Sequence, residues 1–436
     1  MRFYSRIWLY LLPFAYIPNL RGGPATQLGT LEPSDFVMVP LFFLLLLDRD
    51  KTASSNQSNL NKLLLVFFLW ALTSTLLINV RYPYFGDFTA MWFGLAKLGK
   101  LILYAGSGLI IAHKLRVPSL RSKYNWCLLG CLVILSAGIL LSPAAATSAR
   151  DQAAAAKNNA ASVAVSVFCA YLAGLLLARV ESRRWKFWAI MALIIGALGG
   201  LLSQGRGGWL GLAAGVFYLF WTTKRRGLAI GITVGFLTLA ALAYQFIPQV
   251  RHRFEDSLAS NWTPTSKSSE IEVGGIRDGE RIAIWKGNFP RLAEHPILGS
   301  GFYHRGGFTH VPWWGCHNFF LQMGLETGIP GAVMILFAFY VMWANAGAPT
   351  VRSAGLTLGL RAAIIAAIVG NMGGEYYYGG PALLGFFLVF APAGGLLQQV
   401  VKRRFVMVPI LRHPPQTRGP LLAEVPLTAY PNRRES

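Results

Sequence analysis

Long apolar runs separated by short polar stretches dominate this sequence and decide what it can fold into. Hydrophobic residues make up 54% of the 436 residues and charged residues only 13%, about half the charged share of an ordinary soluble domain. A helix that crosses a bilayer upright needs about 20 predominantly apolar residues. The pattern predicts an all-α polytopic membrane protein with about 12 transmembrane helices, at residues 7–20, 34–47, 60–79, 90–112, 126–142, 159–178, 187–203, 208–222, 228–247, 328–344, 353–372 and 381–400.

Lysine and arginine set the expected orientation of these spans. The chain has 40 Lys and Arg residues against 18 Asp and Glu, a formal net charge of +22. In a membrane protein, part of such an excess belongs to cytoplasmic loops, so it does not indicate nucleic acid as a partner. Basic triplets at 224–226 and 402–404 lie directly at the ends of two apolar runs. With these triplets inside, both termini are predicted to be cytoplasmic.

The pattern divides the chain into four segments. Residues 1–247 hold the first nine predicted spans, and 248–327 form a large outer loop with the catalytic region. Residues 328–400 hold the last three spans, and 401–436 form a basic, proline-rich cytoplasmic tail. The outer loop is glycine-rich, far longer than a usual connection, and contains five of the seven histidines. Because loops of this length are usually functional, we expect the chemistry there.

The first candidate site is the turn S-Q-G-R-G-G-W at 203–209, between the seventh and eighth predicted spans. Arg206 would lie at the outer N-terminus of the eighth span. Backbone N–H groups and the positive end of the helix dipole point outward there, and Arg adds a planar fork of donors that suits phosphate. The alternative is that Arg206 only reaches toward lipid headgroups. Gly208, Gly211 and Gly215 indicate close helix packing rather than catalysis.

A second motif, D-G-E-R-I-A-I-W at 278–285, lies within the outer loop. Its amphipathic pattern predicts a helix that ends near Pro290. Arg281 would lie in the first turn, facing whatever Trp285 docks against. The alternative for this arginine is an exposed salt bridge with a neighbouring carboxylate. The turn that follows, 294–301, contains enough glycine for another backbone to approach closely.

The third motif, C-H-N-F-F-L-Q-M-G-L-E-T-G-I-P-G at 316–331, ends the outer loop. Residues 317–326 predict a short helix broken at Gly328 and Pro330, where the tenth span begins. His317 would lie at the outer start of this helix, at the membrane–water boundary. Imidazole has an ordinary pKa of about 6.5, so a form that can act as a base is available at neutral pH. The alternative is a structural histidine, and the glutamate of this motif is expected to be a helix-end or supporting residue.

Motifs for nucleotides and metals are missing from the sequence. No phosphate-binding G-x-x-x-x-G-K-[ST] loop is present, which argues against ATP-driven transport. No H-E-x-x-H is present, and the His and carboxylate spacings do not form a metal cage. Glu32 and Asp35 are the nearest approach to a D-x-D metal motif, and they are kept as a minor alternative. No metal and no cofactor are therefore expected.

The order and spacing of the three motifs resemble the bacterial O-antigen ligase and polymerase superfamily. They read S-x-G-R-G-G, then E-R-x-x-x-W followed by H-P-I-L-G-S-G, then H-N-x-x-L-x-x-x-x-E-x-G-x-x-G. The specific part of the resemblance covers roughly residues 200–331. The resemblance implies a GT-C-like, inverting, metal-independent glycosyltransferase whose donor is a glycan linked to a polyprenyl diphosphate.

The resemblance also implies roles for single residues. Arg206 and Arg281 match the arginines that engage the donor diphosphate, and His317 matches the base that activates the acceptor hydroxyl. Trp209 and Asn318, which lie in the same motifs, are expected to contact substrate. Fixed donors at a developing diphosphate charge, together with a base at the membrane boundary, agree with the chemistry inferred from the residues alone.

Charged residues inside the predicted spans give further candidates. Lys97 and Lys100 lie in the outer half of the fourth span, where a charge usually faces a cavity or water and could meet the lipid diphosphate. The alternative is that they pair with Asp87 or with the interface. Arg361, in the eleventh span, is assigned no role.

The expected function is therefore an O-antigen ligase of the bacterial inner membrane, with its active site facing the periplasm. It would transfer O-antigen from undecaprenyl diphosphate to lipid A–core. The alternatives within the superfamily are an O-antigen or exopolysaccharide polymerase and a protein O-oligosaccharyltransferase. A transporter of lipids or solutes is the rival from another class. It predicts functional charges deep in the spans, whereas the candidates here cluster in one outer loop.

Overall fold

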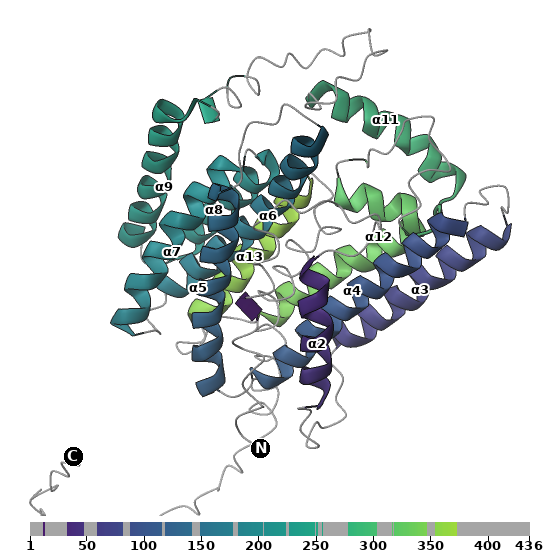
Figure 1. Ribbon diagram of the computed structural model, residues 1–436, viewed down its shortest axis with the longest axis horizontal. Coiled ribbons are helices and arrows are strands. Elements are labelled where there is room, and N and C mark those ends of the chain that lie inside the picture. Colours follow the sequence, from purple (N-terminus) through teal and green to yellow (C-terminus); the bar gives the residue numbers. More distant parts are fainter. Residues whose placement is uncertain are drawn as a thin grey trace, which may run out of the picture.

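The computed structural model describes residues 12–13, 33–47, 59–81, 88–115, 118–141, 149–177, 182–203, 205–223, 226–248, 250–251, 255, 278–302, 316, 318–346 and 354–372. Within these residues the regular elements are all helices (Figure 1). The helices are α2 (Pro33–Leu47), α3 (Asn59–Arg81), α4 (Phe88–Lys114), α5 (Pro118–Leu141), α6 (Ala149–Leu177), α7 (Arg183–Leu202), α8 (Arg206–Thr222), α9 (Arg226–Phe246), α11 (Asp278–Glu294), α12 (Phe319–Asn345) and α13 (Ala354–Met372).

These helices overlap the predicted spans wherever the structure describes them. Among the described residues, six helices are long and apolar enough to cross a membrane, namely α3, α4, α5, α7, α9 and α12. Shorter apolar segments lie in α2, α6 and α13. The predicted spans at 7–20 and 381–400 lie outside the described residues, apart from Leu12 and Pro13. An all-helical membrane protein is therefore confirmed, and the count of about 12 stays a prediction.

The helix α6 begins well before residue 159, where the apolar run predicted it. The added turns contain the polar, alanine-rich sequence R-D-Q-A-A-A-A-K-N-N. Alanine has the highest helix propensity of all residues, so these turns can continue the helix although they are too polar for the bilayer core. Hydropathy therefore marks the apolar part of this helix and not its full length.

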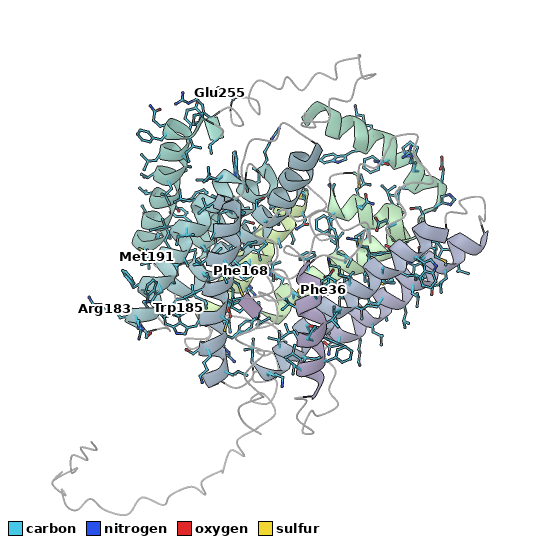
Figure 2. The ribbon with its side chains drawn as sticks, viewed as in Figure 1. Phe36, Phe168, Arg183, Trp185, Met191 and Glu255 are labelled. Carbon is cyan, nitrogen blue, oxygen red and sulfur yellow. The ribbon has the colours of Figure 1, made fainter. Side chains whose placement is uncertain are left out.

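One bundle of helices surrounds α6 (Figure 1). This helix packs on α13, α8, α7 and α5, and α13 also packs on α8. The apolar part of α6 is almost entirely buried, and Phe168 in it is fully enclosed. Trp185 of α7 is fully enclosed as well, at the end of α7 where Figure 2 labels it. A helix buried on all sides is apolar around its whole circumference, as this sequence is.

Small residues let α8 approach its neighbours closely. A Cβ atom added at Gly208 would lie 2.5 Å from the Ser162 hydroxyl oxygen of α6. One added at Gly211 would lie 2.5 Å from the Ala366 carbonyl oxygen of α13, and Gly215 also faces both helices. Real Cβ atoms do not approach other atoms this closely, so only glycine fits. The predicted packing role of these three glycines is confirmed.

The remaining helices form a second group, in which α12 packs on α3, α3 and α2 pack on α4, and α11 packs on α12. The two groups meet where α12 packs on α13. There the Arg361 guanidinium lies 4.9 Å from the centre of the Trp343 ring, a cation–π contact. The Trp343 ring also lies 5.4 Å from that of Tyr218. The C-terminal parts of α8 and α12 therefore meet at this contact.

Large apolar side chains cover much of the outside of the molecule. Examples are Phe36 of α2, labelled in Figure 2, and Phe217, Trp221, Leu237 and Phe246 of α8 and α9, each more than half exposed. A water-soluble protein does not expose so many large apolar groups together. Facing lipid they carry no cost, so these surfaces indicate a membrane protein.

Candidate functional site

The first motif forms a tight turn closed by its own side chains. Helix α7 ends at Ser203, and α8 begins at Arg206. The Ser203 hydroxyl donates to the Gly200 carbonyl at 2.6 Å and accepts the Gly205 N–H at 3.2 Å. Arg206 is thus the first residue of α8, as predicted, with its side chain half-buried. The free N–H groups of a helix start favour an anion, but the contact of Arg206 with a diphosphate stays a prediction.

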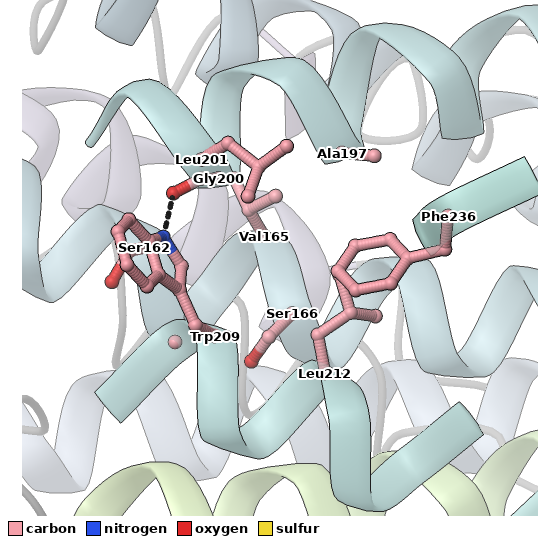
Figure 3. Close-up of a pocket in the computed structure, with 10 residues that line it drawn as sticks. Ser162, Val165, Ser166, Ala197, Gly200, Leu201, Trp209, Leu212 and Phe236 are labelled. Carbon is pink, nitrogen blue, oxygen red and sulfur yellow. Dashed lines mark hydrogen bonds between the residues drawn. The ribbon is translucent and has the colours of Figure 1, made fainter. Parts of the chain in front are cut away.

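Trp209 strengthens the same turn. Its indole N–H donates to the Gly200 carbonyl at 2.8 Å, drawn as the dashed line in Figure 3. The ring lines a cavity of about 10 Å³, which has room for one water molecule at most. The cavity is lined by Ser162, Val165, Ser166, Ala197, Gly200, Leu201, Gly208, Trp209, Leu212 and Phe236 (Figure 3). In this structure Trp209 therefore ties α8 to α7, and its contact with substrate stays a prediction.

The second motif forms α11, and one detail of the predicted helix is wrong. The helix does not end near Pro290 but continues to Glu294. Proline cannot donate the bond that the carbonyl of Lys286 would otherwise accept. Residue 286 is exposed, so water can replace that bond. Beyond the proline the helical bonds continue, since the N–H of His295 donates to the Arg291 carbonyl at 3.3 Å.

Trp285 connects the second motif to the third. Its indole N–H donates to the carbonyl of Cys316 at 2.7 Å, across 31 positions of sequence. Arg281 lies in the same helix four residues earlier, which places both residues on one face of α11. His317 itself lies outside the described residues, but it directly follows the carbonyl that Trp285 holds. The structure therefore joins α11 to Cys316, the residue before His317, and proximity of Arg281 to His317 stays a prediction.

Asn318 is the N-cap of α12. Its side-chain oxygen accepts the N–H groups of Phe320 and Leu321 at 3.0 and 3.1 Å. An Asn at this position satisfies donors that the first helical turn leaves free. The predicted helix start beside His317 is therefore confirmed. Asn318 has a structural task here, and its predicted contact with substrate is not tested.

A buried chain of hydrogen bonds runs behind this helix start. The N–H and the thiol of Cys316 lie 3.2 and 2.9 Å from Gln322 Oε1. The other end of that amide, Gln322 Nε2, donates to the Glu326 carboxylate. Cys316 and Glu326 are each 1% exposed and Gln322 is 5% exposed. Cys316 is therefore hydrogen-bonded to Gln322 of α12 on one side and to Trp285 of α11 on the other.

The predicted break at Gly328 is present. Gly328 has φ 74° and ψ 174°, and α12 kinks there. The turn after α11 docks into the kink: Ser300 N–H donates to the Leu325 carbonyl at 2.7 Å, and Gly301 N–H donates to the Glu326 carbonyl at 2.9 Å. In return, Ile329 N–H donates to the Pro296 carbonyl at 2.8 Å. The glycines of the second and third motifs therefore serve a backbone-to-backbone contact.

Polar side chains of α3 hold this contact from the other side, and sequence reasoning missed them. The Trp70 indole N–H donates to the Thr327 carbonyl at 2.8 Å. The Ser74 hydroxyl lies 3.1 Å from the Glu326 carbonyl, and the Thr75 hydroxyl accepts the Phe302 N–H at 3.0 Å. The sequence did contain a signal for these residues. Three polar groups, two of them one helical turn apart, lie in the otherwise apolar run of α3, and polar groups in such a run usually have a partner inside the protein.

Lys100 has a buried partner that the sequence did not predict. Its ammonium group lies 3.0 Å from an oxygen of Asp35 in α2, and the Tyr104 hydroxyl donates to the other oxygen at 2.7 Å. Lys97 of the same helix is also buried. The alternative partner Asp87 lies outside the described residues. Asp35 therefore joins α2 to α4, and contact of the two lysines with a lipid diphosphate stays a prediction.

Candidate metal ligands do not cluster in the part of the chain that the structure describes. No group of three or more His, Cys, Asp or Glu side chains there could hold a metal ion. Asp35 is engaged by Lys100 and Tyr104, and Glu32 lies outside the described residues. That the protein works without metal or cofactor stays a prediction.

Comparison with protein families agrees with this arrangement. Residues 191–336, about a third of the chain, match the family described as O-antigen ligase. The match supports the O-antigen ligase superfamily for this chain. It runs from α7 into α12 and contains all three motifs. The superfamily implies glycosyltransferase-like ligase or polymerase chemistry on lipid-linked glycans. None of the curated proteins matches the chain.

Proposed function

We propose that this protein is an O-antigen ligase of the bacterial inner membrane with its active site facing the periplasm. It transfers O-antigen polysaccharide from undecaprenyl diphosphate to a sugar hydroxyl of lipid A–core. The observation that carries the proposal is the hydrogen bond from Trp285 to Cys316, because it joins two of the three motifs at the segment of His317. The family match over the same residues supports it.

The proposed reaction is a direct, inverting glycosyl transfer. The imidazole of His317 takes the proton of the acceptor hydroxyl as its oxygen attacks the anomeric carbon of the glycan. The bond from this carbon to the diphosphate breaks, and its electron pair leaves with the diphosphate. Arg206 and Arg281 stabilise the negative charge that develops there, the task that a divalent cation has in many phosphate-transfer sites. Trp209 and Asn318 are proposed to contact the substrates beside these groups.

Two other functions in the superfamily share this chemistry and differ in the acceptor. A polymerase would extend the glycan on its lipid carrier, and a protein O-oligosaccharyltransferase would attach it to a hydroxyl side chain. The compact set of motifs and the single large loop late in the chain favour the ligase. A transporter is the remote alternative, and it would need no base at residue 317.

The first experiment is reconstitution of the purified protein with lipid-linked glycan and lipid A–core, in the presence of a chelator. We expect glycan on lipid A–core, and no product after His317→Ala although this variant still folds and binds donor. Growth of the glycan on its carrier would identify a polymerase instead. Product that forms only when a divalent cation is added would contradict the roles of Arg206, Arg281 and His317.

Lys97 and Lys100 are proposed to bind the donor diphosphate, and a binding measurement tests this. Donor affinity is compared among the wild type, Lys97→Ala and Lys100→Ala. Because Lys100 already pairs with Asp35, we expect the larger loss of affinity for Lys97→Ala. Unchanged affinity in both variants would remove the two residues from the site.

A further inference from the structure

The segment around His317 is held in part by the side chains of Gln322 and Glu326, to which the proposed reaction assigns no role. Cys316 has its N–H and thiol directed to Gln322 and its carbonyl held by Trp285. Asn318 is committed to capping α12. Hydrogen bonds therefore hold the residues that precede and follow His317 in the sequence.

Glu326 orders this arrangement because a carboxylate only accepts hydrogen bonds. It can pair with the Nε2 end of the Gln322 amide and not with the Oε1 end. This fixes the direction of the amide, so that Oε1 is turned toward Cys316. Cys316 offers two donors there: an N–H, which needs an acceptor, and a thiol, a weak donor that also lies 3.4 Å from the Asn318 carbonyl oxygen. The direction of the Gln322 amide therefore follows from Glu326 acting as the acceptor.

Burial of this chain of hydrogen bonds has a free-energy cost, because its polar groups are removed from water. The Glu326 carboxylate is 1% exposed and the Gln322 amide is 5% exposed. Both have therefore lost hydrogen bonds to water and keep only those that their protein partners supply. The kink of α12 does not account for the cost, because it is held by backbone atoms of Leu325 and Glu326 and not by the Glu326 side chain. The side chain extends back along the helix to Gln322, toward the helix start.

We propose that Gln322 and Glu326 are positioning residues for His317. They hold Cys316 so that the imidazole at the next position meets the acceptor hydroxyl in reacting geometry. They do not touch substrate themselves. This inference rests on the proposed role of His317 as the base. A displacement of about 1 Å can lower turnover by about a hundredfold without changing substrate binding.

The test exchanges the two side chains. In Gln322→Ala, the Cys316 N–H loses its acceptor and the thiol keeps only the Asn318 carbonyl, so we expect kcat for glycan transfer to fall about 10- to 100-fold with little change in the KM for the lipid-linked donor. In the double variant Gln322→Glu/Glu326→Gln, the carboxylate accepts from Cys316 directly and the new amide donates to it. The hydrogen bonds are restored, so we expect turnover within a few-fold of the wild type.

The matched control is Thr327→Val. It removes a buried hydrogen bond of the same helix, from the Thr327 hydroxyl to the Met323 carbonyl, without touching Cys316. We expect it to lower the Tm and leave kcat unchanged. A simple structural role for Gln322 predicts the opposite pattern, in which all variants lose activity in proportion to Tm and the double variant is no better than Gln322→Ala.

Hydrogen exchange separates this inference from the proposed function. Amide exchange of the peptide that contains residues 316–321 should become faster in Gln322→Ala and return to the wild-type rate in the double variant, with or without activity. If Gln322→Ala does not fold, the isosteric Glu326→Gln takes its place, with faster exchange expected. Unchanged exchange in a folded variant, or full turnover by Gln322→Ala, would overturn the proposal. A wild type without transferase activity would overturn the proposed function alone.

Discussion

At the scale of single residues, the motif glycines serve contacts between backbones. Gly299, Gly301 and Gly328 have φ of 65°, 92° and 74°, where a side chain is strained. A Cβ atom at Gly328 would also lie 1.9 Å from the Ile297 carbonyl oxygen. These glycines let the turn after α11 reach the kink of α12. They therefore build the site without taking part in its chemistry.

The variant Gly328→Ala tests whether the backbone contact at the kink of α12 requires glycine. Positive φ alone costs a non-glycine residue about 1–3 kcal/mol, and the clash with Ile297 adds to it. We expect a clearly lower Tm of the purified protein in detergent and a lower yield of folded protein. The control is Gly324→Ala in the same helix, where the nearest atom to the new Cβ is a Leu292 side-chain carbon at 3.5 Å. Equal Tm values for the two variants would contradict the backbone contact.

Other residues in the site could be predicted only in part. The sequence placed Arg206 at a helix start and His317 beside one, because caps and turns are local in sequence. It did not pair Lys100 with Asp35 or find Trp70, Ser74 and Thr75, since those partners lie far along the chain. Their signal was polar character inside an apolar run, which marks a residue as engaged but does not name its partner.

At the scale of helices, small residues decide which elements lie together. Helices in a membrane gain little from burying apolar surface against each other, so close packing drives their association. Helix α8 approaches α6 closely at Gly208 and α13 closely at Gly211. The same interface holds the start of α8 and hence the backbone of Arg206. Packing between these helices therefore sets the position of the Arg206 backbone.

Gly211→Ala should disturb this packing. Its Cβ would lie 2.5 Å from the Ala366 carbonyl oxygen, which is backbone and cannot give way. We expect a loss of about 1–3 kcal/mol in stability, measured as a lower Tm in detergent. Gly231→Ala in α9 is the control, because nothing lies within 4 Å of its new Cβ. That variant should be neutral or slightly more stable, and a Tm as low as that of Gly211→Ala would contradict this account.

At the scale of the whole molecule, the two groups of helices carry different motifs. The first motif lies on α8 in the bundle around α6, and the other two lie on α11 and α12 in the second group. The contact of Arg361 and Tyr218 with Trp343 joins the groups near the ends of α8 and α12. That all three motifs face the periplasm stays a prediction.

The predicted orientation is tested by labelling with a membrane-impermeant maleimide. Glu255 lies in the predicted periplasmic loop and Thr222 at the predicted cytoplasmic end of α8, and both are exposed. In cells with a permeabilised outer membrane, we expect Glu255→Cys to be labelled and Thr222→Cys to be labelled only after lysis. The unmodified protein is the control, since three of its four cysteines are buried and Cys127 is half-buried. The reverse pattern would invert the topology.

The positions of the apolar helices that the structure describes, the helix start at Arg206 and the break at Gly328 were readable from the sequence, because hydropathy, caps and glycine act on near neighbours. The resemblance to the ligase superfamily was readable too, since its motifs are short. Only the tertiary structure decided that Trp285 donates to Cys316 and that Gln322, backed by Glu326, accepts from Cys316. It alone decided that side chains of α3 form hydrogen bonds to the kink of α12. These contacts depend on how the helices pack against one another. The residues that meet are irregularly spaced along the chain, so no periodic sequence pattern predicts which of them pair.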